Sequence, residues 1–201
     1  MIKILTKPLS AEPLVVKNSR FIAEVFPVTS QQEAREKLKE QKTKYQDARH
    51  VVHAFVIGNT GQILGSSDDG EPSGTAGRPV LDVLKGSLIT NILLTVTRYF
   101  GGTLLGTGGL VKAYGDSAKK ILQELSEKGF TEALIEKKDI SFSISYDMYE
   151  QLKHLMKSFP LTNIKEEFLT EINISAVIEK ESFDKFSDAV KNFSNGKIIL
   201  K

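Results

Sequence analysis

The alternation of apolar and polar positions along the chain predicts two groups of strands and helices. In the first two thirds, apolar and β-branched runs of strand length alternate with segments of helical periodicity. The strands predicted there are residues 20–28, 51–57 and 89–97, and the helices are residues 30–45, 80–86 and about 107–129. The remaining long segment, residues 63–79, is rich in glycine, serine and proline, which predicts turns and loop.

The last third of the chain has its own regular pattern. Ile140, Phe142 and Ile144 alternate with serines, the period of a half-buried strand. A helix, two strands and a second helix are predicted next, and residues 197–200 are predicted as a final strand. This βαββαβ order is the ferredoxin-like pattern. We therefore predict an α+β protein of two domains, residues 1–130 and 131–201.

Composition favours a soluble, cytoplasmic protein. The 201 residues are 40% hydrophobic and 26% charged, and none is cysteine, which excludes disulfides, thiolate nucleophiles and Cys-ligated zinc. Lys3, Lys7 and Pro8 interrupt the N-terminal apolar run, so we expect no signal peptide. The apolar stretches are of strand length, far below the roughly 20 residues that span a bilayer, so we expect no membrane partner.

Charge and glycine both concentrate in the first domain. The net charge of the chain is +2, and residues 1–130 hold 17 basic and 13 acidic side chains together with all five arginines. This excess is mild compared with that of a protein held to nucleic acid by charge alone. Thirteen of the fifteen glycines fall between Gly58 and Gly115, so chemistry that needs tight turns is expected there.

One informative segment, residues 98–114 (RYFGGTLLGTGGLVKAY), places a glycine-rich loop between a buried strand and a helix. Free backbone amides and the positive end of a helix dipole suit a phosphate or carboxylate. The spacing matches neither the P-loop nor the dinucleotide fingerprint, and glycines that serve only turning and packing remain the alternative. The predicted anion- or nucleic-acid-binding residues are Arg78, Arg98, Gly101, Gly102, Gly106, Gly108, Gly109 and Lys112.

The other informative segment, residues 66–79 (SSDDGEPSGTAGRP), carries three carboxylates in a loop. Asp68, Asp69 and Glu71 are suited to a hard cation, but aspartates in loops also bond their own backbone, and a recognition surface is a third interpretation. We expect no metal and no cofactor. The predicted loop residues, together with a structural histidine, are His50, Asp68, Asp69, Gly70, Glu71, Pro72, Ser73, Gly74, Thr75 and Gly77.

Catalytic motifs give no assignment. The sequence contains no nucleophile elbow, no HExxH and no Ser–His–Asp pattern. His50 and His53 lie three apart on a predicted strand and so point to opposite faces, which makes them a poor joint metal site. A protein without an assigned catalytic reaction is the favoured interpretation.

The two segments, together with Ser19-Arg20-Phe21-Ile22 and Ala48-Arg49-His50, resemble the signatures of the YigZ/IMPACT family. The resemblance implies a first domain with the left-handed βαβ fold of a small-subunit ribosomal protein and of an elongation factor G domain. It implies a ferredoxin-like second domain similar to the last domain of elongation factor G. Eukaryotic relatives regulate the kinase pathway that controls translation initiation, and bacterial relatives have a suspected role in nucleic-acid or ribosome binding.

Three functions follow as expectations. The favoured one is a translation-associated regulator that binds RNA, the ribosome or a translation factor. The first alternative is a metal-dependent hydrolase that uses Asp68, Asp69 and Glu71 with Arg98. The second alternative is a protein-interaction regulator whose binding surface is the loop around residues 68–77. The relative positions of Asp68, Glu71, Arg98 and residues 101–109 discriminate between them.

Overall fold

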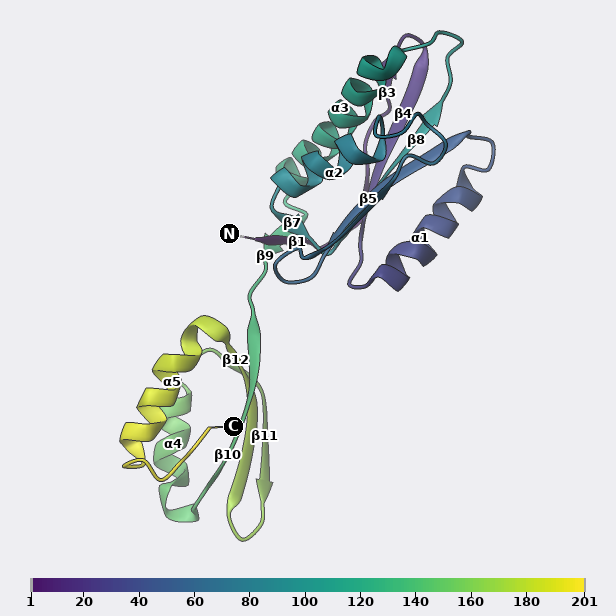
Figure 1. The fold of residues 1–201 in the computed structure, drawn as a ribbon. Helices are drawn as coiled ribbons and strands as arrows, with labels where there is room; N and C mark the ends of the chain where they lie inside the picture. Colours follow the sequence, from purple (N-terminus) through teal and green to yellow (C-terminus); the bar gives the residue numbers. More distant parts are fainter. Residues whose placement is uncertain (1, 201) are drawn as a thin grey trace. The chain divides into compact units, whose positions relative to one another are not determined.

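A computed structural model describes residues 2–200 and divides the chain into two compact units, Met1–Leu134 and Ile135–Lys201. Both units combine helices with antiparallel strands, which confirms the predicted α+β class (Figure 1). Among the described residues, no helix has both the length and the apolar character needed to cross a membrane.

The first unit holds two sheets and the longest helix among the described residues. Its strands are β1 (Lys3–Leu5), β2 (Leu9–Ser10), β3 (Leu14–Val16), β4 (Ser19–Pro27), β5 (His50–Ile57), β6 (Ile63–Ser67), β7 (Ile89–Thr90), β8 (Ile92–Tyr99) and β9 (Thr131–Ala133). Its helices are α1 (Gln31–Lys44), α2 (Gly77–Gly86) and α3 (Gly106–Glu127). The small sheet has the order β7-β1-β9, so residues 131–133 pair with the N-terminal strand of this unit.

The main sheet has the order β2-β4-β8-β5-β6, and β3 pairs with the edge of β4. Both β4 and β5 run antiparallel to β8, so they are parallel to each other and α1 connects them across β8. Figure 1 shows α2 and α3 on one face of this sheet and α1 on the other. Residues 63–67, predicted as loop, form β6 because each pairs with a residue of β5.

The face beneath α2 and α3 carries the larger apolar core. Phe21, Val25 and Leu94 on the strands pack with Leu84 of α2 and Tyr114 of α3, all fully or almost fully buried. Burial of this many apolar side chains supplies the main stabilisation of the unit. The core thereby fixes the start of α3 against the end of β8.

The face beneath α1 is more polar. Glu24, Thr95 and His53 form a row across β4, β8 and β5, and each has a buried side-chain atom with no hydrogen-bond partner among the described protein groups. Burial lowers the pKa of His53, and nearby Lys42 lowers it further. Buried polar atoms without partners oppose folding, whereas Lys44 of α1 pairs with Glu24 of this row at 2.7 Å.

The second unit is built on the sheet β10-β12-β11, all antiparallel. Its elements are β10 (Lys137–Ile144), the 3₁₀ turn η1 (Tyr146–Met148), α4 (Tyr149–Met156), β11 (Leu161–Phe168), β12 (Ile172–Glu179) and α5 (Lys180–Phe193). Leu152 of α4 and Phe186 of α5 are buried against Ile140 and Ile174 of the sheet. This is the ferredoxin-like order without its last strand.

The predicted strand at residues 197–200 was wrong. Gly196 has a positive φ of 78°, which turns the chain after α5. The Ile198 amide then donates to Ser194 Oγ at 3.0 Å, and the Ile198 side chain is buried. These local contacts hold the segment near the end of α5, and no ladder with β10 forms among the described residues.

Replacement of Gly101 by alanine is expected to destabilise the first unit. A Cβ there would lie 2.0 Å from the carbonyl carbon of Asn18, in the turn between β3 and β4. We expect Gly101→Ala to lower the free energy of unfolding by about 2 kcal/mol or more, as overpacking typically does. The control is Gly108→Ala in α3, where no neighbouring heavy atom lies within 4 Å and the change should be neutral or slightly stabilising. Urea unfolding of both variants measures the difference, and equal effects would contradict the prediction.

Candidate functional site

The segment from Asp68 to Gly77, here named the signature loop, is organised by the carboxylate of Asp68. Its Oδ1 accepts the amides of Ala76 (3.0 Å) and Gly77 (2.8 Å), and its Oδ2 accepts the amide of Gly74 (2.8 Å). The side chain therefore caps the first turn of α2 from eight and nine residues away. Burial alone raises the pKa of Asp68, but the three amide donors together outweigh it and lower that pKa.

Asp69 ties the signature loop to β5 and α1. Its φ of 44° and the φ of 87° at Gly70 form a two-residue turn closed by the Glu71 amide, which donates to the Asp68 carbonyl at 3.0 Å. Asp69 Oδ2 accepts the amide of Val51 (2.8 Å), and Oδ1 pairs with Lys42. Burial opposes ionisation of Asp69, yet Lys42 and the Val51 amide lower its pKa. Asp69 thus has a structural role, since it connects the signature loop to β5 and α1.

Glu71 turns inward and forms a buried ion pair with Arg98. Arg98 Nη1 donates to Glu71 Oε1 at 2.8 Å, and the two side chains are 7% and 3% exposed. The Tyr114 hydroxyl of α3 donates to the same oxygen at 2.8 Å. Burial and the adjacent Glu71 carboxylate raise the pKa of Tyr114, so it stays a hydrogen-bond donor. One carboxylate therefore joins the signature loop, β8 and α3.

Aromatic and hydroxyl groups complete the surroundings of Arg98. Its guanidinium carbon lies 5.6 Å from the ring centre of Phe21 and 5.5 Å from that of Phe100, within cation–π range. Ser19 Oγ accepts the Gly101 amide at 3.2 Å and lies 3.4 Å from Arg98 Nη2. The Arg98 Nε has no protein acceptor among residues 2–200. The arginine is thus held rigidly by its neighbours.

A half-enclosed cavity of about 420 Å³ opens where these groups meet, and we name it the α3 cavity. Its polar lining comes from Arg49, His50, Glu71, Arg98, Gly106 and Thr107. Its apolar lining comes from Pro72, Phe100, Leu104, Leu105 and Leu110. An apolar cavity of this size with a few polar groups is typical of a ligand site.

The first turn of α3 presents free amides to the α3 cavity. The N-cap residue of this 22-residue helix is Leu105, which makes no side-chain cap, and the first turn has no acidic residue. Gly106 and Thr107 are exposed, and Gly106 has a positive φ of 73°, which favours glycine. The N-terminal amides and the helix dipole make this rim of the cavity electropositive.

His50 borders the same cavity in a fixed orientation. Its Nδ1–H donates to the Asp69 carbonyl oxygen at 2.8 Å. That bond turns the other ring nitrogen, Nε2, away from the signature loop. A structural histidine, as predicted, would make a contact such as the one at Nδ1. The His50 ring also lines the cavity, so it can contact a ligand there as well.

The predicted anion-binding residues do not all meet. Arg98 and Gly106 line the α3 cavity, whereas Arg78 turns outward along α2 and pairs with Asp82 at 2.8 Å. Lys112 is exposed on α3 outside the cavity lining. Gly101 serves close packing rather than ligand contact. Gly102, Gly108 and Gly109 are at or near the surface of the loop and the first turn of α3, also outside the lining.

The loop carboxylates are each engaged by protein donors. Asp68 and Asp69 accept backbone amides in separate directions, and Glu71 is committed to Arg98 and Tyr114. Among the described residues, no three acidic, histidine or cysteine side chains gather as metal ligands do. Ser73 and Gly74 are exposed at the loop tip, Thr75 bonds the Pro72 carbonyl, and Gly77 packs against the Ser67 backbone.

Sequence reasoning missed three members of the site. Arg49 lies beside His50 at the start of β5, and the Ala-Arg-His pattern was its only signal. Phe100 and Tyr114 lie inside the glycine-rich segment, and Tyr114 fits the apolar spacing of α3, which gives no sign of a polar contact. The hydroxyl of Tyr114 reaches Glu71 because that carboxylate is itself buried.

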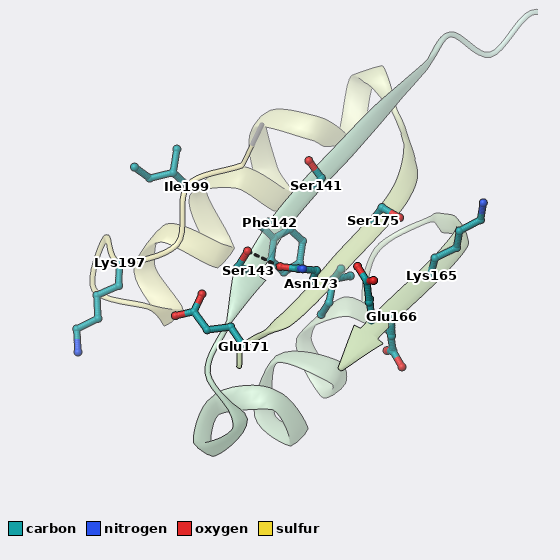
Figure 2. A pocket seen from close by; sticks show the side chains of 12 residues that line it. Ser141, Phe142, Ser143, Lys165, Glu166, Glu171, Asn173, Ser175, Lys197 and Ile199 are labelled. Carbon is teal, nitrogen blue, oxygen red and sulfur yellow. Dashed lines mark hydrogen bonds between the residues drawn. The ribbon is translucent and has the colours of Figure 1, made fainter. Parts of the chain in front are cut away.

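The second unit carries a shallower hollow on the uncovered face of its sheet. Figure 2 shows this face, where Ser143 Oγ donates to Asn173 Oδ1 at 2.7 Å. Lys165 and Lys197 line it together with Glu166, Glu167 and Glu171, so acidic groups outnumber basic ones. This face therefore lacks the excess of basic groups that attracts a phosphate backbone.

Comparison with known proteins defines the class to which the chain belongs. The model of the Impact N-terminal domain matches residues 17–122, which include the signature loop and the α3 cavity. The chain therefore belongs to the IMPACT family.

Particular relatives cover nearly the whole chain. IMPACT family member YvyE of Bacillus subtilis is 32% identical over 97% of this chain and 88% of its own length. IMPACT family member YigZ of Escherichia coli is 33% identical over 92% of this chain and 90% of its own length. A crystal structure of a hypothetical protein superposes with a TM-score of 0.69 at 31% identity, covering 99% of this chain and 95% of the other.

Replacement of Asp68 by asparagine should destabilise the first unit in a pH-dependent way. Asparagine retains one oxygen but cannot accept the Gly74 amide with its nitrogen, so we expect a loss of about 1–2 kcal/mol at pH 7. The folded-state pKa of Asp68 is lowered, so its contribution is present above the unfolded-state pKa and lost as pH falls through the folded-state value.

Chemical denaturation of the wild type and of Asp68→Asn between pH 7 and pH 2.5 measures this effect. The difference in stability should shrink toward the acidic end. The control is Asp82→Asn, which removes only an exposed pair with Arg78 and should have little effect. A difference that is constant with pH would contradict the role of the ionised carboxylate.

Removal of the Tyr114 hydroxyl tests the buried network. Tyr114→Phe loses the bond to Glu71 but keeps the edge-to-face contact with Phe21, whose ring centre lies 5.1 Å away. We expect a loss of about 1.5–3 kcal/mol, because the acceptor is a buried charge. Tyr99→Phe removes an exposed bond to Asp47 and should cost less than about 1 kcal/mol in thermal unfolding. Equal losses in both variants would overturn this ranking.

Proposed function

We propose that this chain is a translation-associated binding protein that contacts RNA through the α3 cavity. The main observation in support of this proposal is that one cavity is bordered by Arg49, the rigid Arg98 and the uncapped first turn of α3. Arginine guanidinium groups and helix N-terminal amides are the protein groups that best recognise phosphate. Membership of the IMPACT family supports the link to translation, because the family resemblance implies a role in translational control.

The electrostatics suit selective rather than general binding. Glu71 neutralises Arg98, so the excess positive charge at the cavity comes from exposed Arg49 and from the helix end, worth about half an elementary charge. The net charge of the whole chain is only +2. We therefore expect few phosphate contacts and a weak dependence of affinity on salt.

The hydrolase alternative loses its geometric basis. It required Asp68, Asp69 and Glu71 to converge on one cation, and each of these carboxylates is engaged by separate protein donors. The protein-interaction alternative retains one specific observation: Leu104 is 82% exposed at the rim of the cavity, and Phe100 is 46% exposed. Large exposed apolar side chains are typical of partner surfaces.

Replacement of Arg49 by glutamine tests the proposal. Filter binding to ribosomes and to structured RNA at low salt should show affinity reduced about 3- to 10-fold. The slope of log affinity against log salt concentration should become smaller in magnitude by about one. The matched control is Arg78→Gln, because Arg78 is exposed and paired with Asp82 outside the cavity. The Arg78→Gln variant should keep the affinity and the salt dependence of the wild type.

Two results would contradict the proposal. One is that the wild type binds neither ribosomes nor RNA. The other is an equal loss of affinity in Arg49→Gln and Arg78→Gln, which would indicate that RNA responds to the overall positive charge of the protein and not to a specific site. A partner that is captured by the wild type, resists ribonuclease and is lost on Leu104→Ser would favour the protein-interaction function instead.

A further inference from the structure

The shape of the α3 cavity restricts which part of a nucleic acid can enter it. Pro72 of the signature loop contributes apolar surface to the lining, together with Leu104, Leu105 and Leu110. Proteins that follow a continuous strand use open, positively charged grooves. A half-enclosed hollow of about 420 Å³ with an apolar lining instead has the size of a small-molecule site. It suits a strand end or a free nucleotide rather than an internal segment.

The polar groups of the cavity suit a terminal phosphate. A terminal phosphomonoester carries close to two negative charges at neutral pH, because its second pKa is about 6, whereas an internal phosphodiester carries one. Gly106 and Thr107, at the uncapped start of α3, line the cavity. Arg98 lines it as well; its side chain is 7% exposed and paired with Glu71, and its buried Nε–H finds no acceptor in the described protein.

Phe100 provides a surface for the base. Its ring is 46% exposed and lines the cavity, and the Arg98 guanidinium supports it at 5.5 Å. An exposed aromatic ring accepts any base by stacking, without reading its sequence. His50, whose Nδ1–H donates to the Asp69 carbonyl, leaves Nε2 as an acceptor for a hydroxyl group of the ligand.

From these observations we propose that the α3 cavity binds a nucleotide through its terminal phosphomonoester, with the phosphate at the first turn of α3 and the base against Phe100. The source is the phosphorylated end of an RNA strand or a free mononucleotide, which share this chemistry. This inference rests on the proposed function and narrows it from RNA contact to recognition of a terminus.

The test uses the full chain and fluorescent single-stranded RNA of one sequence with a 5′-phosphate, a 3′-phosphate or hydroxyls at both ends. Fluorescence anisotropy should show at least 10-fold tighter binding of one phosphorylated form than of the hydroxyl form. Unlabelled adenosine 5′- or 3′-monophosphate, matched to the preferred end, should compete for that binding. A free nucleotide that binds as tightly as the RNA identifies the mononucleotide as the ligand.

Two matched variants localise the preference. Thr107→Glu places a carboxylate in the first turn of α3, where acidic residues stabilise helices, so the protein should fold while its preference for a phosphorylated end disappears. Thr103→Glu adds the same charge on the exposed loop outside the cavity lining and should retain the preference. Loss of the preference in both variants would overturn the assignment to this cavity.

The remaining outcomes separate this inference from the proposed function. Equal binding of all three RNAs, still weakened by Arg49→Gln, would overturn terminal recognition and leave RNA contact standing. No binding of any RNA would overturn the proposed function, and no binding of the adenosine monophosphates either would overturn terminal recognition as well. Binding of a peptide with an apolar C-terminal residue, in place of RNA, would also overturn both, because a carboxylate would then be the anion that the cavity accepts.

Discussion

The buried ion pair between Glu71 and Arg98 is the interaction on which the site depends. It joins residues 27 positions apart, and the Tyr114 hydroxyl adds α3 to the same carboxylate. Burial of two charges is costly, and their attraction compensates only when further hydrogen bonds satisfy them. Tyr114 and Ser19 provide such bonds here. The pair therefore contributes less to stability than to the choice of a single arrangement for two glycine-rich segments.

All three carboxylates of the signature loop have structural contacts. Asp68 caps α2, Asp69 braces β5 and α1, and Glu71 neutralises Arg98. Each acidic group therefore has a protein partner, which leaves the electropositive end of α3 and Arg49 to dominate the cavity. An anion-accepting site can thus exist in a chain whose net charge is only +2.

Local pattern predicted much of the fold, because strands and helices with one buried face show their period in the sequence. Strands β4, β5 and β8 and helices α1 and α3 lie within a few residues of the predicted segments. Strand β6 was missed since its Gly-Ser-Ser end depends on pairing with β5, and residues 197–200 were assigned to a strand although Ser194 and Gly196 redirect them. The sequence located both informative segments, but side-chain directions such as those of Arg78 and Tyr114 depend on contacts between distant residues.

A double-mutant cycle between Glu71→Gln and Arg98→Met tests most directly whether the buried pair unites the two segments. Each single replacement leaves its partner buried and unpaired, and the double replacement removes both charges. The account predicts that the unfolding free energies of the four proteins give a coupling energy of about 2 kcal/mol or more. Single effects that add, with a coupling energy near zero, would contradict it.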